Sequence, residues 1–165
     1  MIHLGFGFIL GIALYFRSNI RNIHLFYPTM VYVAVCKFLY EVIANERFYL
    51  WKIKPDFIFD DLGLILFHAL FLYPFSAFLF LHNYPQGIKK QLFHYAWWIA
   101  IYAVLEWIAL RYGNITYYHG WSFRWSVFFL VNMFVLIRIH DRHPYWGIIL
   151  TVISTLFYMT VFKMF

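Results

Sequence analysis

A few ionisable or amide side chains lie inside long apolar runs or at their ends, and these are the residues that could do chemistry. A polar group in hydrocarbon is costly, so its presence there first suggests a functional site. Carboxylates together with histidine could bind a cation, relay a proton or hold a metal ion. The residues are Lys37, Glu41, Asp60, Asp61, His68, Glu106 and Asn132.

The order of these residues along the chain predicts that most of them share one membrane face. If successive helices alternate in direction, the ends of the second and fourth apolar runs lie beside the starts of the third and fifth. Asp61 and His68 are also two helical turns apart on one helix face, about 10 Å along the axis. The predicted polar site consists of Glu41, Asp60, Asp61, His68, Glu106, Arg111, His119, Trp121 and Arg124.

Three interpretations of this site compete. In the first, the charges are structural: Lys37 could pair with Glu41 four residues later, and Glu106 with Arg111 or Arg124. In the second, the acids form a cation or proton site of a small transporter. In the third, the protein is an intramembrane enzyme.

The sequence lacks the motifs that would favour an enzyme. It has no His-Glu-x-x-His metal motif, no glycine-rich phosphate loop and no Gly-x-Ser-x-Gly elbow. We therefore expect no metal ion and no cofactor. The structural interpretation ranks first and the enzyme third.

The composition places the chain in a membrane. Of its 165 residues, 64% are hydrophobic and only 12% are charged, whereas a soluble domain carries about 25% charged residues. The net charge of +6 comes from short basic clusters between apolar runs. Such clusters are typical of residues at the lipid headgroups, and we expect no binding of nucleic acid.

The apolar runs predict an all-α transmembrane bundle that forms a single domain over residues 1–165. We expect about six helices, or five spans if the short first run does not cross the membrane. Pro74 predicts a kink in the third helix. The two sides receive equal numbers of Lys and Arg, so charge bias predicts no orientation. The runs are about 2–16, 26–44, 57–81, 92–110, 125–139 and 145–165.

Several motifs over residues 26–140 resemble an uncharacterised family of small polytopic membrane proteins, found mainly in endospore-forming Gram-positive bacteria. Members often carry Asp where this chain has Glu41, which is a chemically equivalent acid. The motifs are Tyr40-Glu41, Tyr49-x-Trp51 with Pro55, Tyr73-Pro74, Tyr84-Pro85, Glu106-Trp107, Gly113-x-Ile115-x-Tyr117, Trp121 and Ser126.

The resemblance implies a multi-pass protein of the bacterial cell membrane and supplies no activity. It marks Glu41, Glu106 and Trp121, which also belong to the predicted polar site, together with Trp107, Gly113 and Tyr117. Gly113 is expected to allow a turn with positive φ directly after the fourth helix. Together these features favour a non-enzymatic membrane protein with a structural or regulatory role, linked to sporulation by the resemblance alone.

Overall fold

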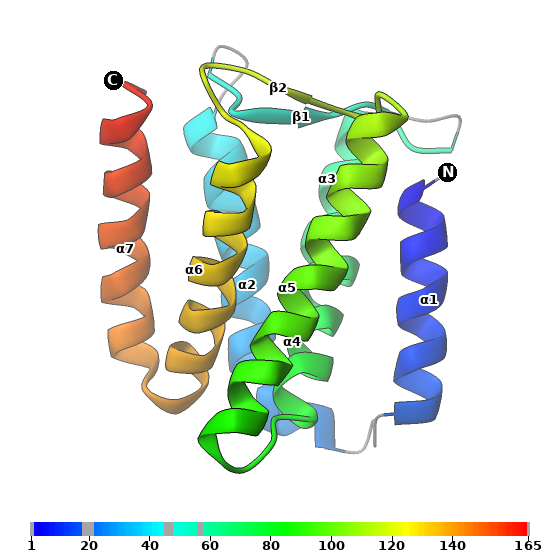
Figure 1. The fold of residues 1–165 in the computed structure, drawn as a ribbon, viewed down its shortest axis with the longest axis vertical. Helices are drawn as coiled ribbons and strands as arrows, with labels where there is room; N and C mark the ends of the chain where they lie inside the picture. Colours follow the sequence, from blue (N-terminus) through cyan, green and yellow to red (C-terminus); the bar gives the residue numbers. More distant parts are fainter. Residues whose placement is uncertain (1, 18–21, 45–47, 56–57, 165) are drawn as a thin grey trace. The chain divides into compact units, whose positions relative to one another are not determined.

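A computed structural model describes residues 2–17, 22–44, 48–55 and 58–164. It is 79% helical, so the predicted all-α fold is confirmed. The described residues form six helices, which can be followed in Figure 1, where α3 and α4 are labelled separately. They are α1 (Ile2–Arg17), α2 (Ile23–Ala44), a helix formed by α3 (Asp61–Phe67), a π-helical turn (His68–Leu72) and α4 (Tyr73–His82), α5 (Ile88–Arg111), α6 (Phe123–Arg142) and α7 (Pro144–Val161).

Five of these helices are long and apolar enough to cross a membrane. The sixth, α1, has 16 residues and reaches only about 24 Å at 1.5 Å per residue, which is short of the ~30 Å hydrocarbon layer. The sequence therefore predicted the helices correctly, and the alternative with five spans matches the helices that have spanning length.

Asp60 is the N-cap residue of the third helix. Its side chain accepts a 2.7 Å hydrogen bond from the backbone N–H of Gly63. A helix leaves its first N–H groups without partners inside the helix, and an Asp at the N-cap satisfies one of them. Asp60 therefore has a local structural function as a helix cap.

Around Pro74 the third helix contains a π-helical turn. Proline has no N–H and its ring crowds the carbonyl of Leu70. Directly before it, the N–H of Tyr73 bonds to the carbonyl of His68, five residues back. The wider turn is one way to relieve the conflict that proline creates inside a helix, and it holds His68 in a buried position.

The chain divides into two compact units, and each is described by itself. The first comprises Met1–Tyr40 and Lys54–His94. In it, α1 packs against α4 and the π-helical turn. Its core holds the fully buried rings of Phe78 and Phe80. The imidazole of His94 stacks on the ring of Phe80 and lies 2.9 Å from the carbonyl of that residue.

The second unit comprises Glu41–Ile53 and Tyr95–Phe165. In it, α6 and α7 form a tight helical hairpin (Figure 1). The ring of Phe134 in α6 packs against aromatic rings from α5, and that of Tyr102 lies nearly perpendicular to it with centroids 5.5 Å apart. The prediction of a single domain over residues 1–165 stays a prediction.

A two-stranded antiparallel sheet links two connections of the second unit. Strand β1 (Trp51–Ile53) follows α2, and β2 (Ile115–Tyr117) follows α5. Trp51 lies opposite Tyr117 in the register. The sheet ties two segments far apart in the sequence to each other, and it positions the site described below.

Candidate functional site

The turn between α5 and β2 changes the direction of the chain so that the helix is followed directly by the strand. Gly113 has φ +67°. Its N–H bonds to the carbonyl of Leu110, and the N–H of Asn114 bonds to that of Ala109. This pair of bonds is a Schellman motif, in which a left-handed residue closes the end of a helix. The positive φ predicted for Gly113 is confirmed.

An aromatic cap closes one end of the second unit. At its centre lies Trp121, of which only 5% is exposed. Its ring centroid is 5.0 Å from that of Trp51 on β1 and 5.1 Å from that of Phe162 after α7. Large rings in tilted and edge contacts bury much apolar area. The cap consists of Leu50, Trp51, Tyr117, Trp121, Trp125, Phe129, Tyr158, Phe162 and Met164.

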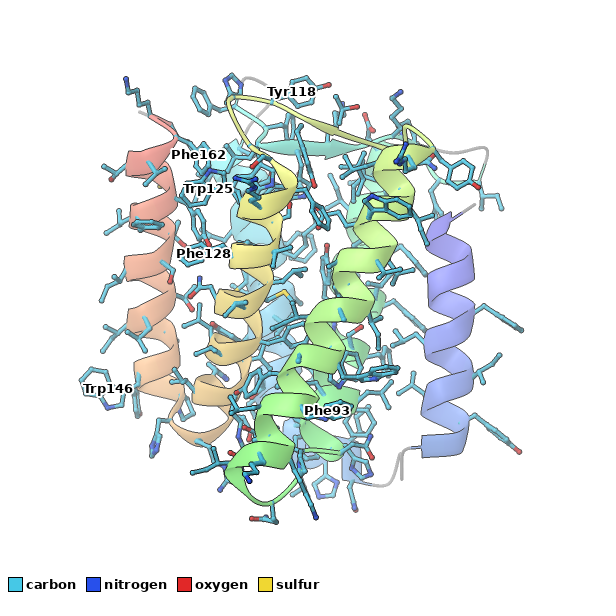
Figure 2. The ribbon with its side chains drawn as sticks, in the orientation of Figure 1. Phe93, Tyr118, Trp125, Phe128, Trp146 and Phe162 are labelled. Atoms are coloured by element: carbon cyan, nitrogen blue, oxygen red, sulfur yellow. The ribbon has the colours of Figure 1, made fainter. Side chains whose placement is uncertain are left out.

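Figure 2 shows part of the cap at one end of the α6–α7 hairpin, at the left of the picture. The labelled rings of Trp125 and Phe162 lie in the space between the two helices, with centroids 5.2 Å apart. Trp146, at the other end of the hairpin, points outward and is 61% exposed. The cap is therefore a packed cluster, distinct from the scattered exposed aromatics of a lipid-facing surface.

Beneath the cap lies a hydrogen-bond network that we call the Glu106 network. The hydroxyl of Tyr117 donates to Glu106 Oε1 at 2.6 Å and lies 3.2 Å from Ser126 Oγ. The indole N–H of Trp121 donates to Ser126 Oγ at 2.7 Å. The network therefore joins α5, β2, the loop after it and α6.

The chemistry of the four groups fixes the direction of the bonds. An indole can only donate, and an ionised carboxylate can only accept. The hydrogen of Tyr117 goes to Glu106, so in the bond between Tyr117 and Ser126 the hydroxyl of Ser126 is the donor. Every donor thus points along one path from Trp121 to Glu106. An ionised Glu106 accepts without having to donate.

Tyr117 is held in its neutral form. Burial raises the pKa of its hydroxyl above the usual value of 10.0, and the hydrogen bond to Glu106 raises this pKa further. Both effects act in the same direction because ionised tyrosine would lose its donor and face a carboxylate. The donor to Glu106 is therefore present throughout the neutral pH range.

Other members of the predicted polar site in the second unit have different partners. Arg111 lies with its guanidinium carbon 5.2 Å from the centroid of the Trp107 ring. The imidazole of His119 stacks on Phe48 with centroids 4.2 Å apart. Arg124 is exposed on the first turn of α6. The suggested ion pair of Glu106 with Arg111 or Arg124 is not formed, and Glu106 accepts a hydrogen bond from Tyr117 instead.

The remaining members of the predicted site are not part of the Glu106 network. Glu41 is half-buried near the end of α2, in the second unit. Asp60, Asp61 and His68 belong to the first unit. The ring of His68 meets that of Tyr73 edge-on at 5.6 Å. Within the described ranges, no group of three His, Cys, Asp or Glu side chains is placed to hold a metal ion.

Tyr117 and Ser126 are network residues that the predicted polar site lacked. A single serine in an apolar helix carries no signal of its own, and a tyrosine in a loop is typical of a membrane interface. Both positions do occur in the motifs that carry the family resemblance. That resemblance was the one signal that could have found them.

The fold and the site define the class of protein. Five apolar helices of spanning length in an all-α chain make this a multi-pass membrane protein. Its polar residues at the cap are engaged in a local hydrogen-bond network. Comparison of the chain with protein-family models, with curated proteins and with solved structures finds no match.

Proposed function

We propose that the chain is a non-enzymatic, structural or regulatory protein of the bacterial cell membrane. In this proposal the Glu106 network is a clasp that fixes the aromatic cap at one membrane face. The single observation that carries the proposal is the 2.6 Å bond from Tyr117 to Glu106. Glu106, one of the acids that first suggested a functional site, is thereby hydrogen-bonded to Tyr117 on strand β2 of the same unit.

The magnitude of the effect supports a structural role. A hydrogen bond to a charged group contributes about 1.5–3 kcal/mol, and an unsatisfied buried partner costs a similar amount. Whole domains have net stabilities of about 5–15 kcal/mol. The clasp is therefore large enough to decide whether the cap is formed.

The test is a double-mutant cycle on the protein purified in a neutral detergent. Tyr117→Phe should lower the free energy of unfolding by about 1.5–3 kcal/mol, because it removes the donor to the carboxylate. Glu106→Gln should cost about 1 kcal/mol, because an amide oxygen still accepts from Tyr117 but without charge. The double variant should show a coupling of about 0.5–3 kcal/mol.

Tyr112→Phe is the matched control, since Tyr112 is 77% exposed and lies outside the network. It should change stability by less than about 0.5 kcal/mol. The clasp is contradicted if Glu106→Gln leaves stability unchanged or raises it. A functional acid often costs stability, so a gain on its removal would point to binding or transport instead.

Binding or transport of a cation or proton is the second candidate function, and the position of His68 supports it. This ionisable side chain is buried within a spanning helix, on a π-helical turn. Such turns occur frequently at functional sites, and ionisable residues within spans commonly mark proton or ion paths. In this candidate His68 is the group that binds the cation or relays the proton.

Proteoliposomes loaded with a pH-sensitive dye test this second candidate. An imposed gradient should then collapse faster with the protein than without it, and His68→Asn should abolish the difference. His82→Asn is the control, because His82 lies at the end of the same helix. Equal fluxes with both variants and with empty liposomes would remove this candidate.

The cellular setting of the proposal is supported by the family resemblance only. The resemblance implies the cell membrane of an endospore-forming bacterium, with a link to sporulation. A fluorescent fusion followed through spore formation tests this part. Signal at the membrane that rises during sporulation is expected, and signal in the cytoplasm would contradict it.

A further inference from the structure

The two ends of the second unit differ in how their basic residues are neutralised. Arg111 ends α5, Arg124 lies in the first turn of α6, and Lys163 follows α7. The last two are direct sequence neighbours of the cap residues Trp125 and Phe162, whose rings touch. Arg111 is on the same α5 end that bears Glu106 of the network. All three cations therefore belong to the cap end.

At the opposite end of the α6–α7 hairpin, a carboxylate neutralises the basic residues. Arg138 donates to Asp141 at 2.7 Å, and Arg142 approaches the same oxygen at 4.0 Å. At the cap end, Arg111, Arg124 and Lys163 are exposed, and among the described residues none of them forms an ion pair. The Glu106 carboxylate accepts a hydrogen bond from the Tyr117 hydroxyl. The cap end thus carries three exposed cations that have no ion-pair partner among the described residues.

Exposed aromatic side chains accompany this charge. Tyr112 follows Arg111 and is 77% exposed, and Trp107, which carries the Arg111 guanidinium on its ring, is half exposed. Tyr118, just after β2, is also exposed and carries a label in Figure 2. Amphipathic rings of this kind prefer the headgroup level of a bilayer, where one side is apolar and the other wet.

We propose that the cap end binds the headgroups of anionic phospholipids. Guanidinium groups match phosphate oxygens with paired donors, and basic residues near an anionic bilayer surface attract it strongly. The flanking rings select a lipid rather than a soluble anion, because they need an apolar layer directly beside the phosphate. This proposal does not depend on the clasp, since none of the three cations is in the Glu106 network.

The experiment measures binding of phosphatidylglycerol and phosphatidylcholine to the full-length protein in neutral detergent, by native mass spectrometry. The test variant is Arg111→Gln with Arg124→Gln and Lys163→Gln. The matched control is Lys89→Gln with Lys90→Gln and Arg142→Gln, which removes the same charge from exposed residues outside the cap end. Unfolding temperatures without lipid show that both variants are folded.

The expected result is a preference of the wild type for phosphatidylglycerol, which the test variant loses and the control keeps. Each cation should contribute roughly fivefold to the affinity, so the full variant should lose well over tenfold. Arg111→Lys with Arg124→Lys should retain part of the preference, because charge remains without the paired donors.

Several outcomes would overturn the proposal. Equal binding of the two lipids by the wild type would show that the face does not recognise negative charge. An equal loss in the control variant would show that net charge, and not the cap end, is responsible. Full displacement of the lipid by inorganic phosphate at the same concentration would assign the face to a soluble anion.

Discussion

The hydroxyl of Tyr117 lies 2.6 Å from Oε1 of Glu106, and this bond ties strand β2 back onto the helix that precedes it. Tyr117 is eleven positions after Glu106 in the sequence, and the Gly113 turn lies between them. The same strand pairs with β1, which follows α2. One carboxylate therefore fixes how a sheet, a loop and a helix end meet at the cap.

Trp121 is the residue whose loss should damage the cap most. Trp121→Phe removes the donor to Ser126 and part of the ring, and should lower the free energy of unfolding by about 1–3 kcal/mol. Trp121→Ala should cost about 3–5 kcal/mol, because it leaves a cavity among the surrounding rings. Denaturant or thermal unfolding in detergent measures both values.

Trp146→Phe is the control for the Trp121 variants. Its ring points outward and is 61% exposed, so the change should stay within about 0.5 kcal/mol. If Trp146→Phe destabilised the protein as much as Trp121→Phe, the cap would have no special role in stability.

The α6–α7 hairpin should depend on Gly147. A Cβ placed there would lie 2.7 Å from Cα of His140, and backbone cannot move aside cheaply. We expect Gly147→Ala to cost about 1–3 kcal/mol, as overpacking does. Gly11→Ala in α1 is the control, because nothing lies within 4 Å of its Cβ position. It should be neutral or slightly stabilising, and a loss at Gly11 equal to that at Gly147 would refute the close contact.

The α5–β2 turn should depend on the left-handed conformation of Gly113. With φ +67°, an L side chain there is strained, and Gly113→Ala should cost about 1–2 kcal/mol. Gly113→Asn should cost less, because asparagine tolerates this region better than other residues. Equal losses of stability for the two variants would indicate that glycine is needed because a side chain does not fit, and not because of the backbone conformation. Unfolding free energies of the three proteins distinguish these cases.

The sequence predicts the helices because their cause is local. Apolar runs that are long enough to cross a bilayer predict where the helices lie, and turns with Pro and Gly between the runs predict where they end. Even the turn at Gly113 follows from one residue with special backbone freedom. Asp60 carries a local signal too, as an N-cap before an apolar run, although its position in a cluster of acids first suggested a ligand.

The hydrogen-bond partners of Glu106 could not be predicted in the same way. The alternating directions of the helices predict how deep a residue lies in the membrane. They place Glu106 at the same membrane face as Arg111 and Arg124, and this common depth favoured an ion pair. They do not fix the direction in which the side chain points around the helix. The partners of Glu106 come from a strand pairing between segments distant in sequence, and no period in the sequence encodes that pairing.

The network also predicts how stability responds to high pH. The folded state raises the pKa of Tyr117 above its usual 10.0, by burial and by the bond to Glu106. Above about pH 10 the unfolded chain therefore loses a proton that the folded protein keeps, and ionisation favours unfolding. The contribution of Tyr117 is fully present below about pH 10 and is lost as pH rises from there toward the folded pKa.

Comparison with Tyr117→Phe isolates this effect from that of the other tyrosines. The stability difference between wild type and Tyr117→Phe should be constant from about pH 7 to pH 9 and should shrink above about pH 10. Absorbance of tyrosinate gives a second readout: at about pH 10.5 the two proteins should show the same signal while folded. A larger tyrosinate signal in the wild type would mean that Tyr117 ionises like an exposed residue. The bond to Glu106 would then not hold its proton.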